Sequence, residues 1–278
     1  MLGRTSIKHY SIIKLFLLIG ILLPSFLWLY QLIDSALKAN HINLHSIETW
    51  ASKKRSLTQI ESTQDLPHAA PGKLHGVDVS HYQGIINWQH VKQHNIHFTI
   101  AKATGGETYI DPQFKHNWQG MRASGFARGA YHFFYANDDP HKQANHFLTT
   151  VGEFKASDLP PILDVEITDH VSQSKLLSRV LVWLETVEKK SRRLPILYTD
   201  VAFAKQYLNS EKLSKYPLWI ADYNKTQPPL PSAWQKQGWQ LWQFTQSGNI
   251  NGINGDVDLS RFKGNAEQFA QFIRQTHL

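Results

Sequence analysis

Short apolar runs recur along the chain from residue 74 onward, and most of them are followed by a stretch with helical periodicity. Each run has the length of one buried strand, and the alternation of strands with helices favours a parallel sheet covered by helices. The candidate strands are residues 74–79, 98–103, 129–134, 161–166, 195–199, 218–221, 240–244 and 256–259. Eight such strands in one domain predict a closed parallel α/β barrel of the TIM type.

Helical patterns lie between most of these runs and become sparse after the fifth strand. They cover residues 88–95, 112–123, 141–151, 174–192, 201–208 and 265–275. In the second of them, Asp111 is the expected N-cap and Pro112 the first helical residue. A doubly wound open sheet is the alternative architecture, but no glycine-rich phosphate-binding turn follows the first strand.

The segment before the barrel predicts membrane attachment. Residues 15–33 carry no charge, and a helix of that length spans about 28 Å, close to the ~30 Å bilayer core. Arg4, Lys8 and Lys14 precede it, which favours a cytoplasmic amino terminus. A cleaved signal peptide is the alternative, although residues 37–39 make a poor cleavage site. The chain thus divides into a cytoplasmic stub and anchor (1–39), a polar linker (40–72) and a barrel (73–278).

The amino-acid composition excludes several kinds of functional site and partner. The chain has no cysteine, which excludes disulfides, zinc–thiolate sites and thiol nucleophiles. Its net charge of +7 is mild, and neither a run of five basic residues nor a base-reading motif is present, so nucleic acid is not an expected partner. His90 and His94 share a helical face without the Glu of a metalloprotease motif. We therefore expect neither a catalytic metal nor another cofactor.

Acidic residues mark the carboxyl ends of several predicted strands, where barrel enzymes carry their working residues. They are Asp78, Asp164 with Glu166, Asp222 and Asp258. Taken singly, each could instead cap a turn. Carboxylates from four strand ends should converge on one mouth of the barrel.

The Asp164-Val165-Glu166 segment is the most specific of these signals. Residues i and i+2 of a strand point the same way, about 6.6 Å apart along the chain. Two acids that leave an apolar strand together should repel, so that one keeps its proton while the other stays ionised. Cleavage of a glycosidic bond uses such a pair. The structural alternative is that Asp164 caps a loop and Glu166 meets a surface lysine.

Aromatic residues cluster near the same strand ends and could stack on sugars. Those chosen as substrate-binding candidates, together with Asp222, are Tyr82, Tyr131, Phe133, Trp219, Tyr223 and Trp242. Tyr135 and Trp239 lie nearby in the sequence. Ordinary core packing is the alternative for about half of these rings.

These segments, in this order, resemble the glycoside hydrolase family 25 lysozymes, also called Chalaropsis-type muramidases. The resemblance runs over about residues 74–262. Its pieces are Gly76-Val77-Asp78-Val79-Ser80-His81-Tyr82-Gln83-Gly84, Asn87-Trp88, Ala101-Lys102-Ala103-Thr104, Tyr109-Ile110-Asp111-Pro112-Gln113-Phe114, Gly129-Ala130-Tyr131-His132-Phe133, Asp164-Val165-Glu166, Leu218-Trp219-Ile220-Ala221, Trp239-Gln240-Leu241-Trp242-Gln243-Phe244 and Val257-Asp258-Leu259. Each piece is weak alone, but the ordered set is specific.

The resemblance implies a distorted barrel of five strand–helix units plus three further strands. It implies hydrolysis of the β-1,4 bond between N-acetylmuramic acid and N-acetylglucosamine in peptidoglycan. Glu166 then corresponds to the general acid and Asp164 to its partner, while Asp78 and Asp258 match two further acidic positions. Tyr131 resembles a residue of the pocket wall. A barrel that binds peptidoglycan without cutting it, and a glycosidase acting on another N-acetylated polymer such as chitin, are the alternatives.

The chain departs from the family pattern in two places. Gly105-Gly106-Glu107 stands where the family often has Glu-Gly after Ala-Thr, so an acid at the rim is lost or displaced. Ser260 replaces a frequent Asn after the last Asp. With the predicted anchor, the expected location is the bacterial inner membrane, with the barrel on the outer side of that membrane.

Overall fold

The computed structural model describes residues 74–223 and 226–277. The predicted anchor and linker lie outside these residues. Within them, no helix is both long enough and apolar enough to cross a bilayer.

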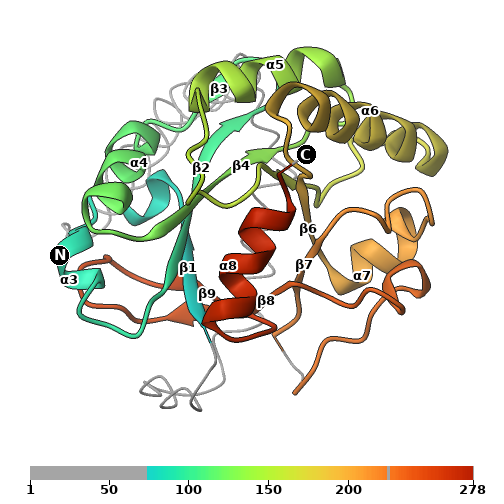
Figure 1. Ribbon diagram of the computed structural model, residues 1–278. Coiled ribbons are helices and arrows are strands. Elements are labelled where there is room, and N and C mark those ends of the chain that lie inside the picture. Colours follow the sequence, from blue (N-terminus) through green and yellow to red (C-terminus); the bar gives the residue numbers. More distant parts are fainter. Residues whose placement is uncertain (1–73, 224–225, 278) are drawn as a thin grey trace, which may run out of the picture. The chain divides into compact units, whose positions relative to one another are not determined.

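Eight strands close into one barrel, as the apolar runs predict (Figure 1). They are β1 (His75–Val79), β2 (Phe98–Gly105), β4 (Ala127–Phe133), β5 (Ile162–Asp164), β6 (Ile196–Asp200), β7 (Leu218–Ala221), β8 (Leu241–Gly248) and β9 (Val257–Phe262). The barrel closes because β1 pairs with β2 on one side and with β9 on the other. A short strand, β3 (Tyr109–Ile110), pairs antiparallel with the end of β2 and was not predicted.

The fully parallel arrangement expected from the strand–helix alternation is wrong for the last strand. β9 runs antiparallel to both β8 and β1. A parallel neighbour needs a crossover connection of a dozen or more residues, usually a helix, whereas only the turn from Asn249 to Asp256 joins β8 to β9. The reversal follows from this hairpin.

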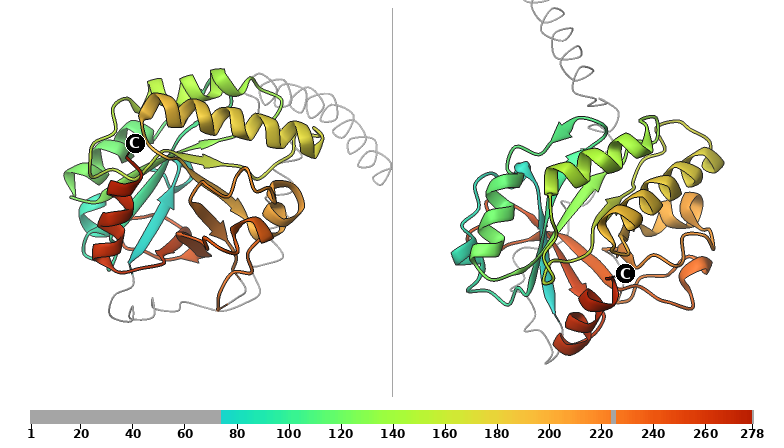
Figure 2. Two further views of the ribbon diagram at one scale, coloured as in Figure 1. Left: turned by 45° about the vertical axis from the view of Figure 1, so that its right-hand side comes forward. Right: turned by 45° about the horizontal axis from the view of Figure 1, so that its top comes forward.

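Helices follow the first five barrel strands and pack on the outside of the sheet (Figure 2). They are α3 (Trp88–Val91), α4 (Phe114–Ala123), α5 (Pro140–Val151), α6 (Gln173–Ser191) and α7 (Val201–Phe203), which continues into the π-helical η2 (Ala204–Leu208). Two short 3-10 turns, η1 (His81–Gln83) and η3 (Ser232–Trp234), and the terminal α8 (Ala266–Gln275) complete the fold. The five strand–helix units and three further strands are therefore present.

Two helix bounds differ from the expected ones. Helix α4 starts at Phe114 rather than at Pro112, although Asp111 still accepts from the backbone N–H of Gln113 through one oxygen and from that of His81 through the other. Helix α3 ends at Val91, four residues before the predicted end.

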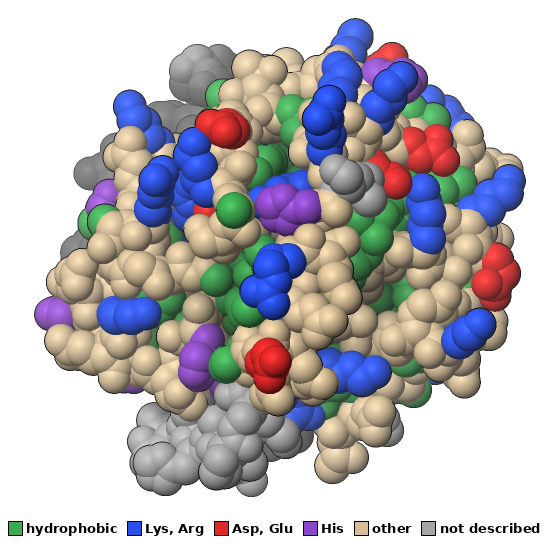
Figure 3. Space-filling view, in the orientation of Figure 1, with side chains coloured by type: hydrophobic (Ala, Val, Ile, Leu, Met, Phe, Trp, Pro, Cys, Tyr) green, Lys and Arg blue, Asp and Glu red, His purple; other side chains and the backbone are tan. Residues whose placement is uncertain are grey.

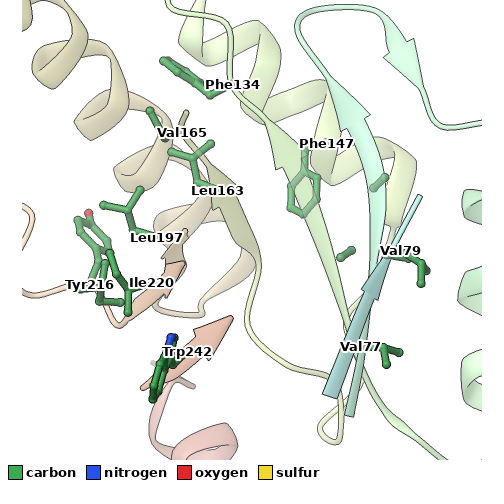
Figure 4. Packing of buried hydrophobic residues seen from close by; sticks show 14 of the residues in the cluster. Val77, Val79, Phe134, Phe147, Leu163, Val165, Leu197, Tyr216, Ile220 and Trp242 are labelled. Carbon is green, nitrogen blue, oxygen red and sulfur yellow. The ribbon is translucent and has the colours of Figure 1, made fainter. Parts of the chain in front are cut away.

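Strand residues alternate between two apolar layers. The outward-facing side chains pack beneath the helices, and Figure 4 shows Val77, Val79, Leu163 and Val165 in this outer layer. The inward-facing side chains fill the barrel, where Phe98, Ile100, Ile162 and others form a second cluster. This alternation decides which residues can reach the mouth of the barrel.

Helix α8 covers the amino-terminal end of the barrel. Its Phe269, Phe272 and Ile273 belong to the inner cluster, and Figure 1 shows α8 lying across the ring of strands. Lys and Arg side chains stand at many points of this face, with acidic side chains among them (Figure 3). Because apolar side chains plug this end, the polar inward-facing groups lie at the carboxyl ends of the strands.

Candidate active site

Three strands bring four carboxyl groups to the carboxyl-terminal mouth of the barrel. Asp78 lies on β1, Asp164 ends β5, Asp258 lies on β9, and Glu166 follows two residues after Asp164. Their strand neighbours Val77, Val165 and Val257 belong to the outer layer, so the acids point inward. The groups act on one another electrostatically, since Glu166, Asp78 and Asp258 each raise the pKa of Asp164. The convergence expected from the sequence is therefore present for these four acids.

Asp78 and Asp258 form a hydrogen-bonded carboxyl pair. They are direct partners in the β1–β9 ladder, and burial raises the pKa of both, that of Asp258 to about 7. Their shared hydrogen bond raises the pKa of Asp78 and lowers that of Asp258. Both carboxyl groups therefore keep a proton to higher pH than an ordinary aspartate does.

Gln243 on β8 also holds the carboxyl group of Asp78. Its amide Nε2 donates to both carboxyl oxygens of Asp78, at 2.9 and 3.1 Å. The hydroxyls of Tyr198 and Tyr223 in turn donate to Gln243 Oε1, at 2.9 and 2.7 Å. Both the donor and the acceptor ends of the amide are thus used, which sets its orientation.

Asp164 and Glu166 differ in their surroundings. Asp164 is buried, and one of its oxygens, Oδ1, has no hydrogen-bond partner among the described residues, while Glu166 is partly exposed. Burial raises the pKa of Asp164 well above its ordinary value, and the charge on Glu166 raises it further. The repulsion predicted for an i, i+2 pair of acids is present.

Lys102 brings a positive charge to this acidic mouth. It faces inward from β2, and its ammonium lies 4.8 Å from the ring centre of Phe133, 5.7 Å from that of Tyr109 and 6.0 Å from that of Tyr131. Burial lowers the pKa of Lys102, whereas Asp164, Asp111 and Glu166 raise it. Such ring faces stabilise a cation that has lost much of its water.

Three of the predicted aromatic residues border the carboxyl groups. Tyr131 and Phe133 point inward from β4, beside Lys102, and Tyr223 reaches Gln243. Burial and the nearby acids raise the pKa of Tyr131 well above its ordinary value, so its phenol stays neutral. Tyr82 lies further out, 69% exposed, with its ring 4.1 Å from that of His81.

The structure does not bring Trp242 or Trp219 to the carboxyl groups. Trp242 faces outward and packs in the layer beneath the helices, because the inward positions of β8 belong to Leu241 and Gln243 (Figure 4). Trp219 points inward but lies in the buried inner cluster, where its Nε1 donates to Ser260 Oγ at 3.0 Å. Asp222 follows β7, and its backbone oxygen accepts from Trp242 Nε1 at 2.8 Å.

Reasoning from strand ends missed three groups of the site: Lys102, Tyr198 and Gln243. The sequence could have shown that they point into the barrel. Each lies an even number of residues after an inward-facing residue of its own strand, namely Phe98, Ile196 or Leu241. No three of the His, Asp and Glu side chains in the described residues are arranged to hold a metal ion.

Both departures from the family pattern have structural roles. Glu107 Oε1 accepts from the backbone N–H of Asp139 at 2.8 Å, and Glu107 also pairs with Lys142 on α5. This acid ties the β2–β3 turn to the start of α5. Ser260 serves as the acceptor for buried Trp219.

Comparison with known proteins agrees with this architecture. The family model of "Glycosyl hydrolases family 25" matches residues 77–253. The chain is 38% identical to "Uncharacterized protein YegX" of Escherichia coli (strain K12) over 205 residues, 72% of this chain and 73% of that protein. It is 30% identical to Lysozyme M1 of Streptomyces globisporus over 214 residues, 73% of this chain and 72% of that protein.

Solved structures are similar as well. The bacterial lysozyme from Streptomyces coelicolor superposes with a TM-score of 0.70 and 28% identity, covering 74% of this chain and 100% of that one. A family 25 glycosyl hydrolase from Bacillus anthracis gives a TM-score of 0.67 and 30% identity, covering 77% and 99%. The chain, with its eight-stranded barrel and four converging carboxyl groups, belongs to glycosyl hydrolase family 25.

Proposed function

We propose that this glycoside hydrolase is a muramidase, which cleaves the β-1,4 bond between N-acetylmuramic acid and N-acetylglucosamine in peptidoglycan. The observation that carries the proposal is the mouth itself, where Asp164 and Glu166 stand beside the hydrogen-bonded pair of Asp78 and Asp258. Similar family members include lysozymes, among them Lysozyme M1.

Glu166 is the proposed general acid. It is the more exposed member of its pair, so it can reach the glycosidic oxygen of a bound glycan. Departure of that oxygen needs a proton, and the sugar left behind develops positive charge. The charge on Asp258 and the anionic form of Asp164 lie where they can stabilise that charge.

Asp164 is the proposed partner for the 2-acetamido group of the substrate. The carbonyl oxygen of that group can attack the anomeric carbon from the face opposite the leaving group. Asp164 Oδ1, without a partner among the described residues, is free to accept from the acetamido N–H and so to orient and stabilise the attacking amide. Glu166, having given up its proton, then activates the water that completes hydrolysis.

Aromatic side chains around the mouth are proposed to hold the glycan. Tyr131 and Phe133 border the carboxyl groups, and the exposed ring of Tyr82 offers an apolar face further out. Sugars pack their apolar C–H faces on such rings. Tyr223 both orients Gln243 and borders the mouth.

Two other activities are separable from this one by experiment. A barrel that only binds peptidoglycan would release no new reducing ends, and a chitinase would release them from chitin. Incubation of the protein with purified peptidoglycan and with chitin, followed by a reducing-end assay, distinguishes all three. We expect release from peptidoglycan alone. Release from chitin alone, or from neither polymer, would overturn the proposal.

We further propose that residues 15–33 form an uncleaved anchor in the bacterial inner membrane, with residues 40–72 as a linker and the barrel on the outer side. The support is the uncharged run of residues 15–33 and the basic residues Arg4, Lys8 and Lys14 before it. Such a tether would keep the enzyme at a high local concentration near its polymer. Amino-terminal sequencing of the mature protein tests this. A start near Asn40 would show signal-peptide removal instead.

A further inference from the structure

We propose that Tyr135 is a further glycan-binding residue of the mouth, and that Gln143 is a positioning residue that holds it in place. The inference deepens the proposed function and rests on it, because the ligand is the glycan strand that the enzyme is proposed to cut. Tyr135 contacts a sugar of that strand outside the one that reacts. Gln143 acts only through Tyr135.

Tyr135 stands at the carboxyl-terminal mouth of the barrel, two residues beyond the end of β4. Phe133, the last residue of β4, is the direct partner of Asp164 on β5, and the backbone N–H of Phe134 donates to the Asp164 carbonyl at 2.9 Å. The ring of Tyr135 lies 5.2 Å from the inward-facing ring of Phe133. Tyr135 therefore continues the aromatic wall of the mouth outward from Phe133, by at most ~7 Å of chain.

The side chain of Tyr135 is accessible to a ligand. It is partly exposed, and its hydroxyl has no hydrogen-bond partner among the described residues. Burial and the nearby acids raise the pKa of Tyr135 to about 12, so the hydroxyl is neutral and can both donate and accept. A sugar offers hydroxyl groups for such bonds and an apolar C–H face for the ring.

The turn between β2 and β3 restricts the ring of Tyr135. A Cβ added at Gly106 would lie 3.2 Å from Tyr135 Cδ2 and 2.6 Å from Asp138 Oδ2, so the backbone of Gly106 packs closely on both side chains. The φ of Gly106 is +57°, which also favours glycine at this position. The ring is thus held in a narrow range of orientations.

Gln143 on α5 holds the backbone of Tyr135 at two points. Its Oε1 accepts from the Tyr135 N–H at 3.0 Å, while its Nε2 donates to the Tyr135 carbonyl at 2.8 Å and to that of Asp138 at 3.2 Å. Gln143 is fully buried, so water does not compete for these bonds. One side chain therefore fixes both hydrogen-bonding groups of the residue that carries the ring.

A buried histidine fixes Gln143 in turn. His132 Nε2 lies 3.0 Å from Gln143 Oε1, and His132 Nδ1 lies 2.7 Å from the hydroxyl oxygen of Thr104. Because an amide oxygen only accepts, Nε2 carries the hydrogen, and Thr104 then donates to Nδ1. Burial lowers the pKa of His132 to about 3, which keeps this ring neutral at neutral pH.

The buried chain of Thr104, His132 and Gln143 ends on the backbone of one partly exposed tyrosine. Its members come from β2, β4 and α5, and a network of buried polar groups whose bonds are all made is rigid. A binding group that is already ordered loses little conformational entropy when its ligand arrives. The network therefore has the form expected of a device that prepares Tyr135 for binding.

The test measures the affinity of E166Q for purified soluble glycan fragments of peptidoglycan by isothermal titration calorimetry, because E166Q should leave the fragments intact. Y135A removes the ring, and Y135F removes only the hydroxyl. The matched control is Y207F, which alters a partly buried tyrosine of the outer layer. We expect Kd to rise about tenfold with Y135A, less with Y135F and not at all with Y207F.

In the active enzyme, Y135A should raise KM by a similar factor and leave kcat near its wild-type value. A contact with a sugar outside the reacting one is equally strong before and during bond cleavage, so its loss weakens binding alone. Thermal unfolding of Y135A should match that of wild type, because the Tyr135 hydroxyl bonds to none of the described residues.

Gln143 is tested by a double-mutant cycle in the same binding assay. Q143L should raise Kd several-fold on its own, and should raise it no further in a protein that already carries Y135A, because its effect runs through that ring. If Q143L does not fold, Q143E carries the same test, since it keeps the acceptor oxygens and loses both amide donors.

Unchanged affinity in Y135A would overturn the assignment of Tyr135. Equal losses of affinity from Q143L with and without the Tyr135 ring would overturn the positioning role of Gln143. Binding needs no turnover. An inactive wild-type protein, which would refute the proposed function, can therefore be told apart from failure of this inference.

Discussion

The carboxyl groups of Asp78 and Asp258 face one another across the antiparallel ladder of β1 and β9, where the two residues are direct partners. Their side chains share a hydrogen bond, and burial raises the pKa of both. The reversal of the last strand is what places Asp258 opposite Asp78. Gln243 on β8, the next strand after β9 in the sheet, donates to Asp78 as well.

Replacement of Gln243 by Leu should destabilise the protein. The hydroxyls of Tyr198 and Tyr223 would lose their acceptor and Asp78 its amide donor, and an unsatisfied buried polar group costs about 1–3 kcal/mol. Urea unfolding measures the change in the free energy of unfolding. The exposed Q119L is the matched control and should change it little. An unchanged stability in Q243L would show that this network contributes nothing.

Substitution of Glu166 by Gln should abolish turnover and leave the fold intact. The side-chain volume is kept while the proton donor is removed, and loss of general acid catalysis lowers kcat by roughly 10²–10⁴-fold. Release of reducing ends from peptidoglycan and circular dichroism of the same samples measure the two effects. The exposed E211Q serves as the control. Near-normal activity in a folded E166Q protein would remove Glu166 from the mechanism.

Much of the fold can be predicted because its signals are local. All eight barrel strands appear as apolar runs in the sequence, and five helices follow the first five of them. The direction of β9 is a property of the β8–β9 connection, which strand periodicity does not report. The break of residues 201–208 into α7 and a π-helical turn likewise depends on packing that a helical pattern alone does not contain.

The candidate site, like the fold, can be predicted from the sequence only in part. The four acids can be found from strand ends, because residue type and position there are both unusual. Trp242 was chosen for its ring, but alternation along β8 turns it to the outer layer and turns Gln243 inward. A lysine in a strand ordinarily suggests a solvent-facing residue, and only the closed barrel shows that Lys102 lies against the rings of Tyr109, Tyr131 and Phe133.

At neutral pH, Asp164 should lower the free energy of unfolding of the protein. Its pKa is raised in the folded state, whereas an unfolded aspartate titrates near ~3.9. The folded state therefore binds the proton more tightly, and stability is lost as pH rises from about 4 through the folded pKa. D164N should melt higher than wild type at pH 7, by about 2–4 °C for each 1 kcal/mol gained.

The same difference should shrink as the pH falls toward about 4, where Asp164 is protonated in both states. Thermal unfolding of D164N and wild type at pH 4 and pH 7 measures it, with E211Q as a control that should follow wild type at both. A D164N protein that melts lower than wild type at pH 7 would contradict the raised pKa.

Attack by the substrate's own acetamido group predicts the stereochemistry of the product. Two successive inversions at the anomeric carbon give net retention, so the first-formed reducing end should be the β-anomer. Proton NMR during the first minutes of hydrolysis distinguishes the anomers before mutarotation mixes them. An initial α-anomer would show inversion, and Asp164 would then act as a base through water.

The central claim is that the barrel cuts the glycan strands of peptidoglycan at the anomeric carbon of N-acetylmuramic acid, which becomes the new reducing end. It is tested most directly by digesting purified peptidoglycan, reducing the new ends with borohydride and identifying the reduced sugar by mass spectrometry, with E166Q as the inactive control. The account predicts that wild-type protein creates ends that carry reduced N-acetylmuramic acid and that E166Q creates few or none. Reduced N-acetylglucosamine at the new ends, or equal release by E166Q, would contradict it.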